Sequence, residues 1–143
     1  MSFITFVPIE INESSKSNWL QYVSCVVAAC ASDGLSQAEK TAISNWLSIQ
    51  GQGASLLDEA VAAASGLTMA AVSVNKSSAF FGPYLVRDAI RMARIDGLGD
   101  KERAAISKLA AAVGVSAHDV KSIEALIEQY EAAEAGWESI LKA

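Results

Sequence analysis

The chain has 143 residues, 52% of them apolar, and a formal net charge of −5 at neutral pH. This length suits a single domain that buries its own core. The acidic balance argues against nonspecific nucleic-acid binding, which needs a surplus of Lys and Arg to meet phosphates. Alanine is abundant and only two prolines interrupt the chain, so we expect an all-α fold.

The amino-terminal residues 1–14 are expected to form an extended arm, with at most a short strand near residues 3–11. They show neither the basic start nor the cleavage site of a secretory signal. No apolar run reaches the roughly 18 residues that a membrane span needs; residues 60–74 come closest and are broken by polar residues. Cys25 and Cys30 lie five residues apart on one expected helix and suit buried thiols in a reducing compartment. These features predict a cytoplasmic protein without membrane insertion.

An internal duplication organises the chain. The segment ASDGLSQAE at 31–39 returns as RIDGLGDKE at 94–102, with a constant offset of 63 residues (96 − 33 and 102 − 39). We expect one domain over 1–143 with repeats at about 19–51 and 82–114. Nine identities keep this register without a gap: Val23/Val86, Asp33/Asp96, Gly34/Gly97, Leu35/Leu98, Glu39/Glu102, Ala42/Ala105, Ile43/Ile106, Ser44/Ser107 and Gly51/Gly114.

Each repeat predicts a helix–Asp-Gly–helix hairpin. An apolar helix (18–32 and 80–95) runs into Asp-Gly, where glycine can adopt the left-handed conformation that ends a helix. Ser36 and Glu39 have the spacing of a capping box at the start of the next helix. In the second repeat Gly99 replaces the serine, and Asp100 compensates in part by placing negative charge in the first turn.

The remaining elements bring the expected number of helices to about seven. The weakly charged stretch 53–85 is expected to form two short helices broken at 65–68, with an apolar surface that either packs in the core or meets a partner. The last helix starts at a second capping box, Ser116 and Asp119, and continues to about Leu141. In an up-and-down bundle with short loops, both Asp-Gly turns then lie at the same end.

The turn carboxylates are the candidate metal site. Asp33, Glu39, Asp96 and Glu102 could converge from the two turns, and carboxylates without a nearby thiolate or histidine suit Ca²⁺, Mg²⁺ or Mn²⁺ better than Zn²⁺. The spacing differs from that of an EF-hand. The competing interpretation is that these acids only shape turns and cap helices.

The doubled motif resembles the TerB-like family, which contains the tellurite-resistance TerB proteins and the amino-terminal domain of a DnaJ-like membrane co-chaperone. The likeness covers about residues 19–127, and it rests on two Asp-Gly turns in register, each with a glutamate five residues after the glycine. The resemblance implies an all-helical bundle, a cytoplasmic and non-catalytic role in a stress- or envelope-associated assembly, and metal binding by the turn acids. Gly99 and the weakly charged middle segment depart from the pattern.

A stripe of arginines is the second candidate site. Arg87, Arg91 and Arg94 fall on one face of their helix, where they either face solvent or hold an acidic partner. An acidic stripe on the last helix could meet them: Glu124, Glu128, Glu131 and Glu138. His118, the only histidine, is expected at the surface.

These observations predict a non-catalytic binding or adaptor module with a protein partner, holding a divalent cation at the paired turns. A purely structural interaction or dimerisation domain without metal is the first alternative, and a homodimer stays open. A hydrolase that uses the paired carboxylates as acid and base is the other alternative, for which the sequence offers few further polar groups.

Overall fold

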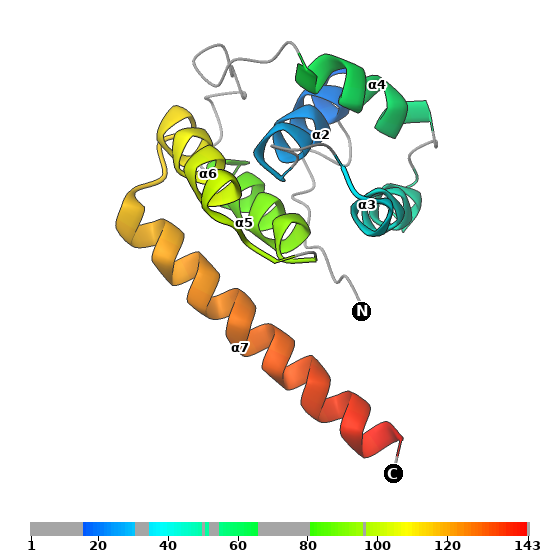
Figure 1. Cartoon of the computed structure of the whole chain (residues 1–143), viewed down its shortest axis with the longest axis vertical. Helices are drawn as coiled ribbons and strands as arrows, with labels where there is room; N and C mark the ends of the chain where they lie inside the picture. Colours follow the sequence, from blue (N-terminus) through cyan, green and yellow to red (C-terminus); the bar gives the residue numbers. More distant parts are fainter. Residues whose placement is uncertain are drawn as a thin grey trace.

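The fold is entirely helical in the part of the chain that the computed structural model describes, residues 16–30, 35–49, 51, 55–65, 81–95 and 97–142. Helices account for 86% of these residues and no strand occurs among them, which confirms the all-α prediction. The described helices are α2 (Lys16–Cys30), α3 (Gln37–Ile49), α4 (Ser55–Ser65), α5 (Phe81–Ala93), α6 (Asp100–Ala112) and α7 (Ala117–Leu141), shown in Figure 1.

The expected number of seven helices is corrected to six within the described residues. Helix α4 is the first of the two short helices expected in the middle segment. The second falls within residues 66–80, and the extended arm with its short strand falls within residues 1–15; both lie outside the described residues.

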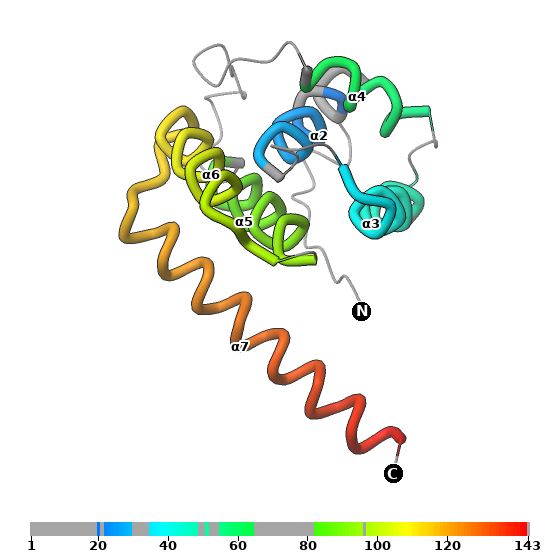
Figure 2. The backbone as a smooth tube through the Cα atoms, in the orientation of Figure 1, coloured from blue at the N-terminus to red at the C-terminus, as the bar shows by residue number. Residues whose placement is uncertain are grey.

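Helices α2 and α5 form the centre of the molecule. α2 contacts α4, α5 and α6, and α5 contacts α2, α3, α6 and α7. Both are buried on nearly every side, as expected for helices that partners surround. Helices α3 and α4 lie on one side of this central pair, with α6 and α7 on the other (Figure 2). The central core residues are Tyr22, Val23, Cys25, Val26, Val27 and Ala29 on α2, and Leu85, Val86, Ala89, Ile90, Met92 and Ala93 on α5.

The internal duplication is visible in the helix boundaries. α3 and α6 start and end with the sequence offset of 63 residues (100 − 37 and 112 − 49), and α2 and α5 end with it as well (93 − 30). Gly51 and Gly114, equivalent in the two repeats, follow α3 and α6 with left-handed φ values of 76° and 78°. Gly97 of the second Asp-Gly turn has φ 93°, as the sequence predicts. The helix pairs α2–α3 and α5–α6 thus follow the register of the sequence repeat.

Helix α7 differs in length from the others. It has 25 residues, contacts α5 and α6, and its carboxyl-terminal half extends beyond the other helices (Figure 1). None of the described helices is both long enough and apolar enough to cross a bilayer.

Candidate partner-binding groove

In the first turn, Glu39 helps to cap the amino-terminal end of α3. The backbone N–H of Glu39 donates to Ser36 Oγ at 3.1 Å, and the N–H of Ser36 donates to Glu39 Oε1 at 3.0 Å. This reciprocal pair is the capping box that the sequence predicts. The Glu39 side chain is buried, so its carboxylate sits in the cap rather than in open solvent.

The second turn has Gly99 at the position that Ser36 occupies in the first turn. Gly99 caps α6 without a side-chain hydrogen bond. A Cβ at this position would come within 2.7 Å of Glu102 Oε2, so the glutamate side chain lies over the glycine. Glu102 therefore occupies the place equivalent to Glu39, although it is more exposed.

The structure describes only two of the four proposed metal ligands. Asp33 and Asp96 lie outside the described residues, and among the described residues no three His, Cys, Asp or Glu side chains are grouped to hold a metal ion. Glu39 and Glu102 are placed, each at the start of its helix. His118, expected at the surface, is exposed.

The acidic stripe of α7 does meet cationic side chains. Arg94 donates to both carboxylate oxygens of Glu131, from Nε at 3.1 Å and from Nη2 at 2.9 Å, and its Nη1 lies 3.6 Å from Glu128 Oε1. The bond to Glu131 raises the pKa of Arg94. Arg103 of α6 pairs in the same forked way with Glu124. These pairs fasten α7 to α5 and α6.

The solvated-face interpretation of the arginine stripe is wrong for Arg91. Its side chain is buried, with 8% of the residue exposed, and its guanidinium lies 5.5 Å from the ring centroid of Tyr130. Burial lowers the pKa of Arg91. Arg91 and Arg94 contact residues of α7 because α5 is a central helix with neighbours on several sides, whereas Arg87 pairs with Asp88 on its own helix.

A buried carboxylate, which the sequence did not single out, joins the central helices. Asp88 on α5 accepts a hydrogen bond at 2.5 Å from the hydroxyl of Tyr22 on α2, and Arg87 Nε donates to its other oxygen at 3.0 Å. Burial raises the pKa of Asp88, while Arg87 and Tyr22 act in the opposite direction. Burial and the neighbouring carboxylate raise the pKa of Tyr22 well above its usual value, so its hydroxyl stays protonated.

Asp88 occupies the position equivalent to Cys25 of the first repeat (88 − 25 = 63). Burial raises the pKa of the Cys25 thiol to about 11, which keeps it protonated and unreactive at neutral pH. Both side chains are in the core, so the second repeat carries a charge at a position where the first carries a small apolar group. Self-comparison of the two repeats was the signal that could have found Asp88.

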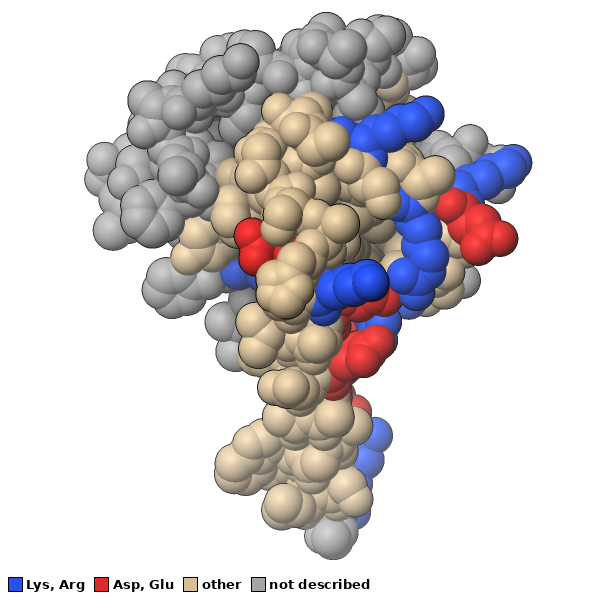
Figure 3. Space-filling model, turned by 90° about the vertical axis from the view of Figure 1, so that its left-hand side faces the viewer, with Lys and Arg blue, Asp and Glu red and all other residues tan. Residues whose placement is uncertain are grey.

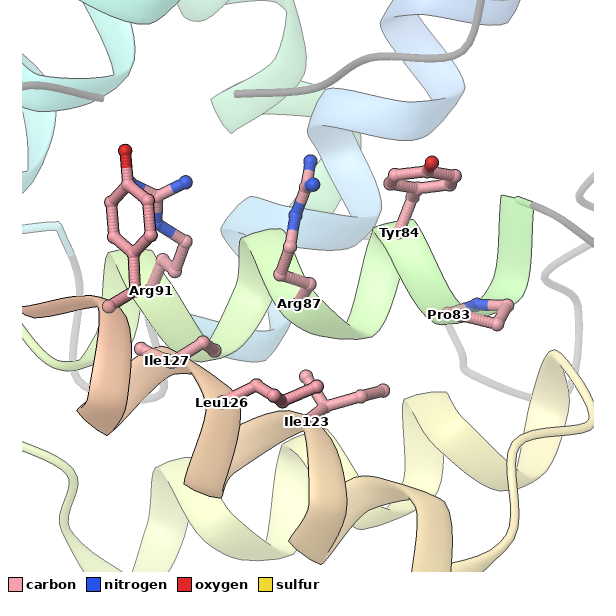
Figure 4. Close-up of a pocket in the computed structure, with 8 residues that line it drawn as sticks. Pro83, Tyr84, Arg87, Arg91, Ile123, Leu126 and Ile127 are labelled. Carbon is pink, nitrogen blue, oxygen red and sulfur yellow. The ribbon is translucent and has the colours of Figure 1, made fainter. Parts of the chain in front are cut away.

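An apolar groove runs between α5 and α7. It has a volume of about 420 Å³. Ile123, Leu126 and Ile127 rise from α7 toward α5, on which Tyr84, Arg87 and Arg91 stand (Figure 4). The guanidinium of Arg87 lies 4.7 Å from the ring centroid of Tyr84. Pro83 and Tyr130 also line the groove, and none of its described lining residues carries a carboxylate.

No family model, no curated protein and no solved structure matches this chain. The interpretation of the groove therefore depends on its own chemistry. Apolar floors with a few polar groups at the edge are typical of sites that bind another molecule by shape and hydrophobic contact. The cationic edge favours ligands that carry negative charge beside the apolar part.

The groove continues into an exposed face of α7. Three large apolar side chains stand in solvent along this helix beyond the groove, on the part that extends past the other helices (Figure 1). Figure 3 shows that the surface of this projecting end is mostly uncharged on the side in view. The exposed residues in and beyond the groove are Leu126, Tyr130, Trp137, Ile140 and Leu141.

Proposed function

We propose that this chain is a non-catalytic helical binding module that docks an apolar, acid-flanked helical segment in the groove between α5 and α7. The observation that carries the proposal is the groove itself, with an isoleucine and leucine floor and two arginines at its edge. A helix that presents apolar residues every three or four positions fits such a groove, since this is a common mode of peptide recognition.

The TerB-like resemblance supports the same class of function, because that family implies a binding role in a stress- or envelope-associated assembly in the cytoplasm. The resemblance adds a second candidate, a divalent cation held by Asp33, Glu39, Asp96 and Glu102. One structural observation favours it: α3 and α6 begin in the same repeat register, so the two acidic turns lead into equivalent helices. The capping bond of Glu39 supports the rival interpretation, in which the acids serve the helices alone.

Peptide binding tests the groove directly. The probe is a fluorescein-labelled amphipathic helical peptide with leucines at alternating three- and four-residue spacing and a glutamate-rich outer face. We expect it to bind in an anisotropy titration, and a twin with lysines in place of the glutamates to bind more weakly because of the arginine edge.

Leu126→Glu places a charge in the groove at a position that is 63% exposed, so we expect the variant to fold. It should weaken peptide binding at least about tenfold, the ratio that a loss of about 1.4 kcal/mol gives. Val61→Glu makes the same kind of change on α4, outside the groove, and serves as the matched control. Equal binding by wild type and Leu126→Glu, or no binding of either peptide, would contradict the proposal.

A further inference from the structure

The apolar face of α7 has the spacing of a coiled coil. Ile123, Leu126, Tyr130, Ala133, Trp137 and Ile140 alternate at intervals of three and four residues over three heptads. This repeat averages 3.5 residues and forms a seam along one side of a helix, suited to a second helix. Only the first part of the seam contacts α5; Trp137 and Ile140 are 65% and 66% exposed.

The exposed apolar area on α7 is large for a small monomer. Leu126, Tyr130, Trp137, Ile140 and Leu141 together leave on the order of 600 Å² in solvent, since one large apolar side chain presents about 150–250 Å² when fully exposed. That is the upper limit of the largest patch on a typical monomer. It also approaches the roughly 800 Å² that each partner buries in a stable interface.

The two halves of α7 have complementary shapes. The amino-terminal half forms the floor of a hollow, the groove, while the carboxyl-terminal half carries the protruding side chains of Trp137, Ile140 and Leu141. Parallel pairing of two copies would put groove against groove and leave both unfilled. Antiparallel pairing places the protruding half of each copy over the groove of the other, in one two-fold symmetric contact.

We infer that the occupant of the groove is the α7 end of a second copy of this chain, bound antiparallel around Ala133. This inference rests on the proposed binding role of the groove and names its partner. The side chains beside the seam permit close approach, because they include Gln129 and Gly136 and only one charge, Glu134. A Cβ on Gly136 would meet nothing within 4 Å in the chain, so this side of the helix is open.

The helix dipoles also favour the antiparallel arrangement, because it places opposite ends of the two α7 helices side by side.

The proposed dimer is tested by measuring molar mass as a function of protein concentration. In light scattering or sedimentation from micromolar to submillimolar protein, we expect the mass to rise from 15.0 kDa toward twice that value. The double variant Trp137→Glu/Ile140→Glu should raise the dissociation constant at least roughly thirtyfold, as the loss of a central aromatic anchor does. Val61→Glu, the same type of change on α4, should leave it unchanged.

Cross-linking tests the direction of pairing. Leu126 and Ile140 are equidistant from Ala133 (133 − 126 = 140 − 133), so an antiparallel dimer brings them together. When Leu126→Cys and Ile140→Cys chains are mixed and oxidised, the mixed disulfide should predominate, with oxidised wild type as the control for Cys25 and Cys30. Predominance of the disulfide between two Ile140→Cys chains would show parallel pairing and overturn the arrangement.

The outcomes for the groove and for its occupant can be told apart. The double variant keeps its groove intact, so it should bind the labelled acidic peptide although it no longer self-associates. If wild type stays at 15.0 kDa throughout while the peptide binds, the groove serves a different protein and the second copy is wrong. If wild type dimerises but Leu126→Glu dimerises equally well, the contact lies elsewhere and the inference fails, whereas the role of the groove fails only if the peptide titration contradicts it.

Discussion

At the scale of single residues, Asp88 is the carboxylate on which the core depends most. It is 1% exposed, and its oxygens are held by Tyr22 from α2 and by Arg87 from its own helix. Tyr22→Phe keeps the ring and its tilted contact with Trp46, and removes only the hydroxyl. We expect a loss of about 1.5–3 kcal/mol in the free energy of unfolding at neutral pH, measured by urea denaturation, since the hydrogen bond is to a charged group.

The loss of stability in Tyr22→Phe should depend on pH, and the direction of that dependence follows from the raised pKa of Asp88. Burial raises its pKa above the ordinary value of 3.8, so the stability this group contributes is fully present below pH 3.8 and declines as the pH rises through the folded-state pKa. The Tyr22 hydroxyl favours the ionised form, so Tyr22→Phe raises the pKa of Asp88 further. The difference between variant and wild type should therefore be small in acid and grow as the pH rises. A difference independent of pH would show that the hydroxyl does not act through the carboxylate.

Arg91 gives a second prediction at this scale. Arg91→Glu would replace a buried guanidinium with a carboxylate near Asp88 and remove the cation from the Tyr130 ring. We expect it to cost about 3 kcal/mol or more in the free energy of unfolding, because it leaves buried like charges in proximity. Arg103→Glu is the matched control: Arg103 is 53% exposed and pairs with Glu124 at the surface, so its replacement should cost about 1 kcal/mol or less. If thermal or urea denaturation shows that Arg91→Glu and Arg103→Glu lose similar free energy of unfolding, Arg91 behaves as a solvated side chain and the prediction is wrong.

At the scale of elements, the helix starts were the most predictable feature. Ser36 with Glu39 and Ser116 with Asp119 identified the starts of α3 and α7, and the corresponding hydrogen bonds are present. Capping is a local interaction between residues three positions apart, so the sequence contains all of it. The face that a helix buries is a different matter. The sequence left open whether Arg91 faces solvent or an acidic partner, because a helical wheel assumes one apolar side, whereas α5 is enclosed by several neighbours.

The two Asp-Gly turns permit a prediction that separates a cation site from a helix cap. If Asp33 and Asp96 only shape turns, Asp33→Asn or Asp96→Asn should cost little, because asparagine also accepts hydrogen bonds and tolerates the left-handed region. If they share a cation, either change removes a charged ligand that a neutral amide cannot restore. Added Ca²⁺, Mg²⁺ or Mn²⁺ should then raise the melting temperature of metal-stripped wild type and of neither variant. An unchanged wild-type melting temperature with all three ions at millimolar concentration would end the cation hypothesis.

At the scale of the whole molecule, the groove could not be located from the sequence. Its lining comes from α5 and α7, about forty residues apart in the chain, and depends on how closely two helices approach. The apolar residues of α7 were visible as a helical pattern, and that pattern predicted the helix. The pattern did not predict that Trp137 and Ile140 would remain largely exposed rather than be covered by the described residues of their own chain.

The duplication explains why the central helices α2 and α5 are so fully buried. Two copies of one helical unit place their first helices together, so Val23 and Val86, equivalent in the repeats, are both fully buried. The helices that follow the repeats differ in length: α4 has 11 residues and α7 has 25. The extra length of α7 carries the exposed end of the seam, so α7 contributes both to the groove and to the segment proposed to fill it.

The same architecture predicts that neither half folds alone. The central helices α2 and α5 contact each other and bury residues such as Val26 and Ala89, and the Tyr22–Asp88 bond crosses between the halves. A fragment of residues 81–143 would expose the inner side of α5, and repeat units that share one core do not bury enough apolar surface singly. In circular dichroism melts, fragments 1–80 and 81–143 should each lack a cooperative transition, while the whole chain unfolds in one step. An equimolar mixture should recover part of the helical signal, because the two surfaces are complementary. A cooperative melt of isolated 81–143 would show that the second repeat is an independent domain.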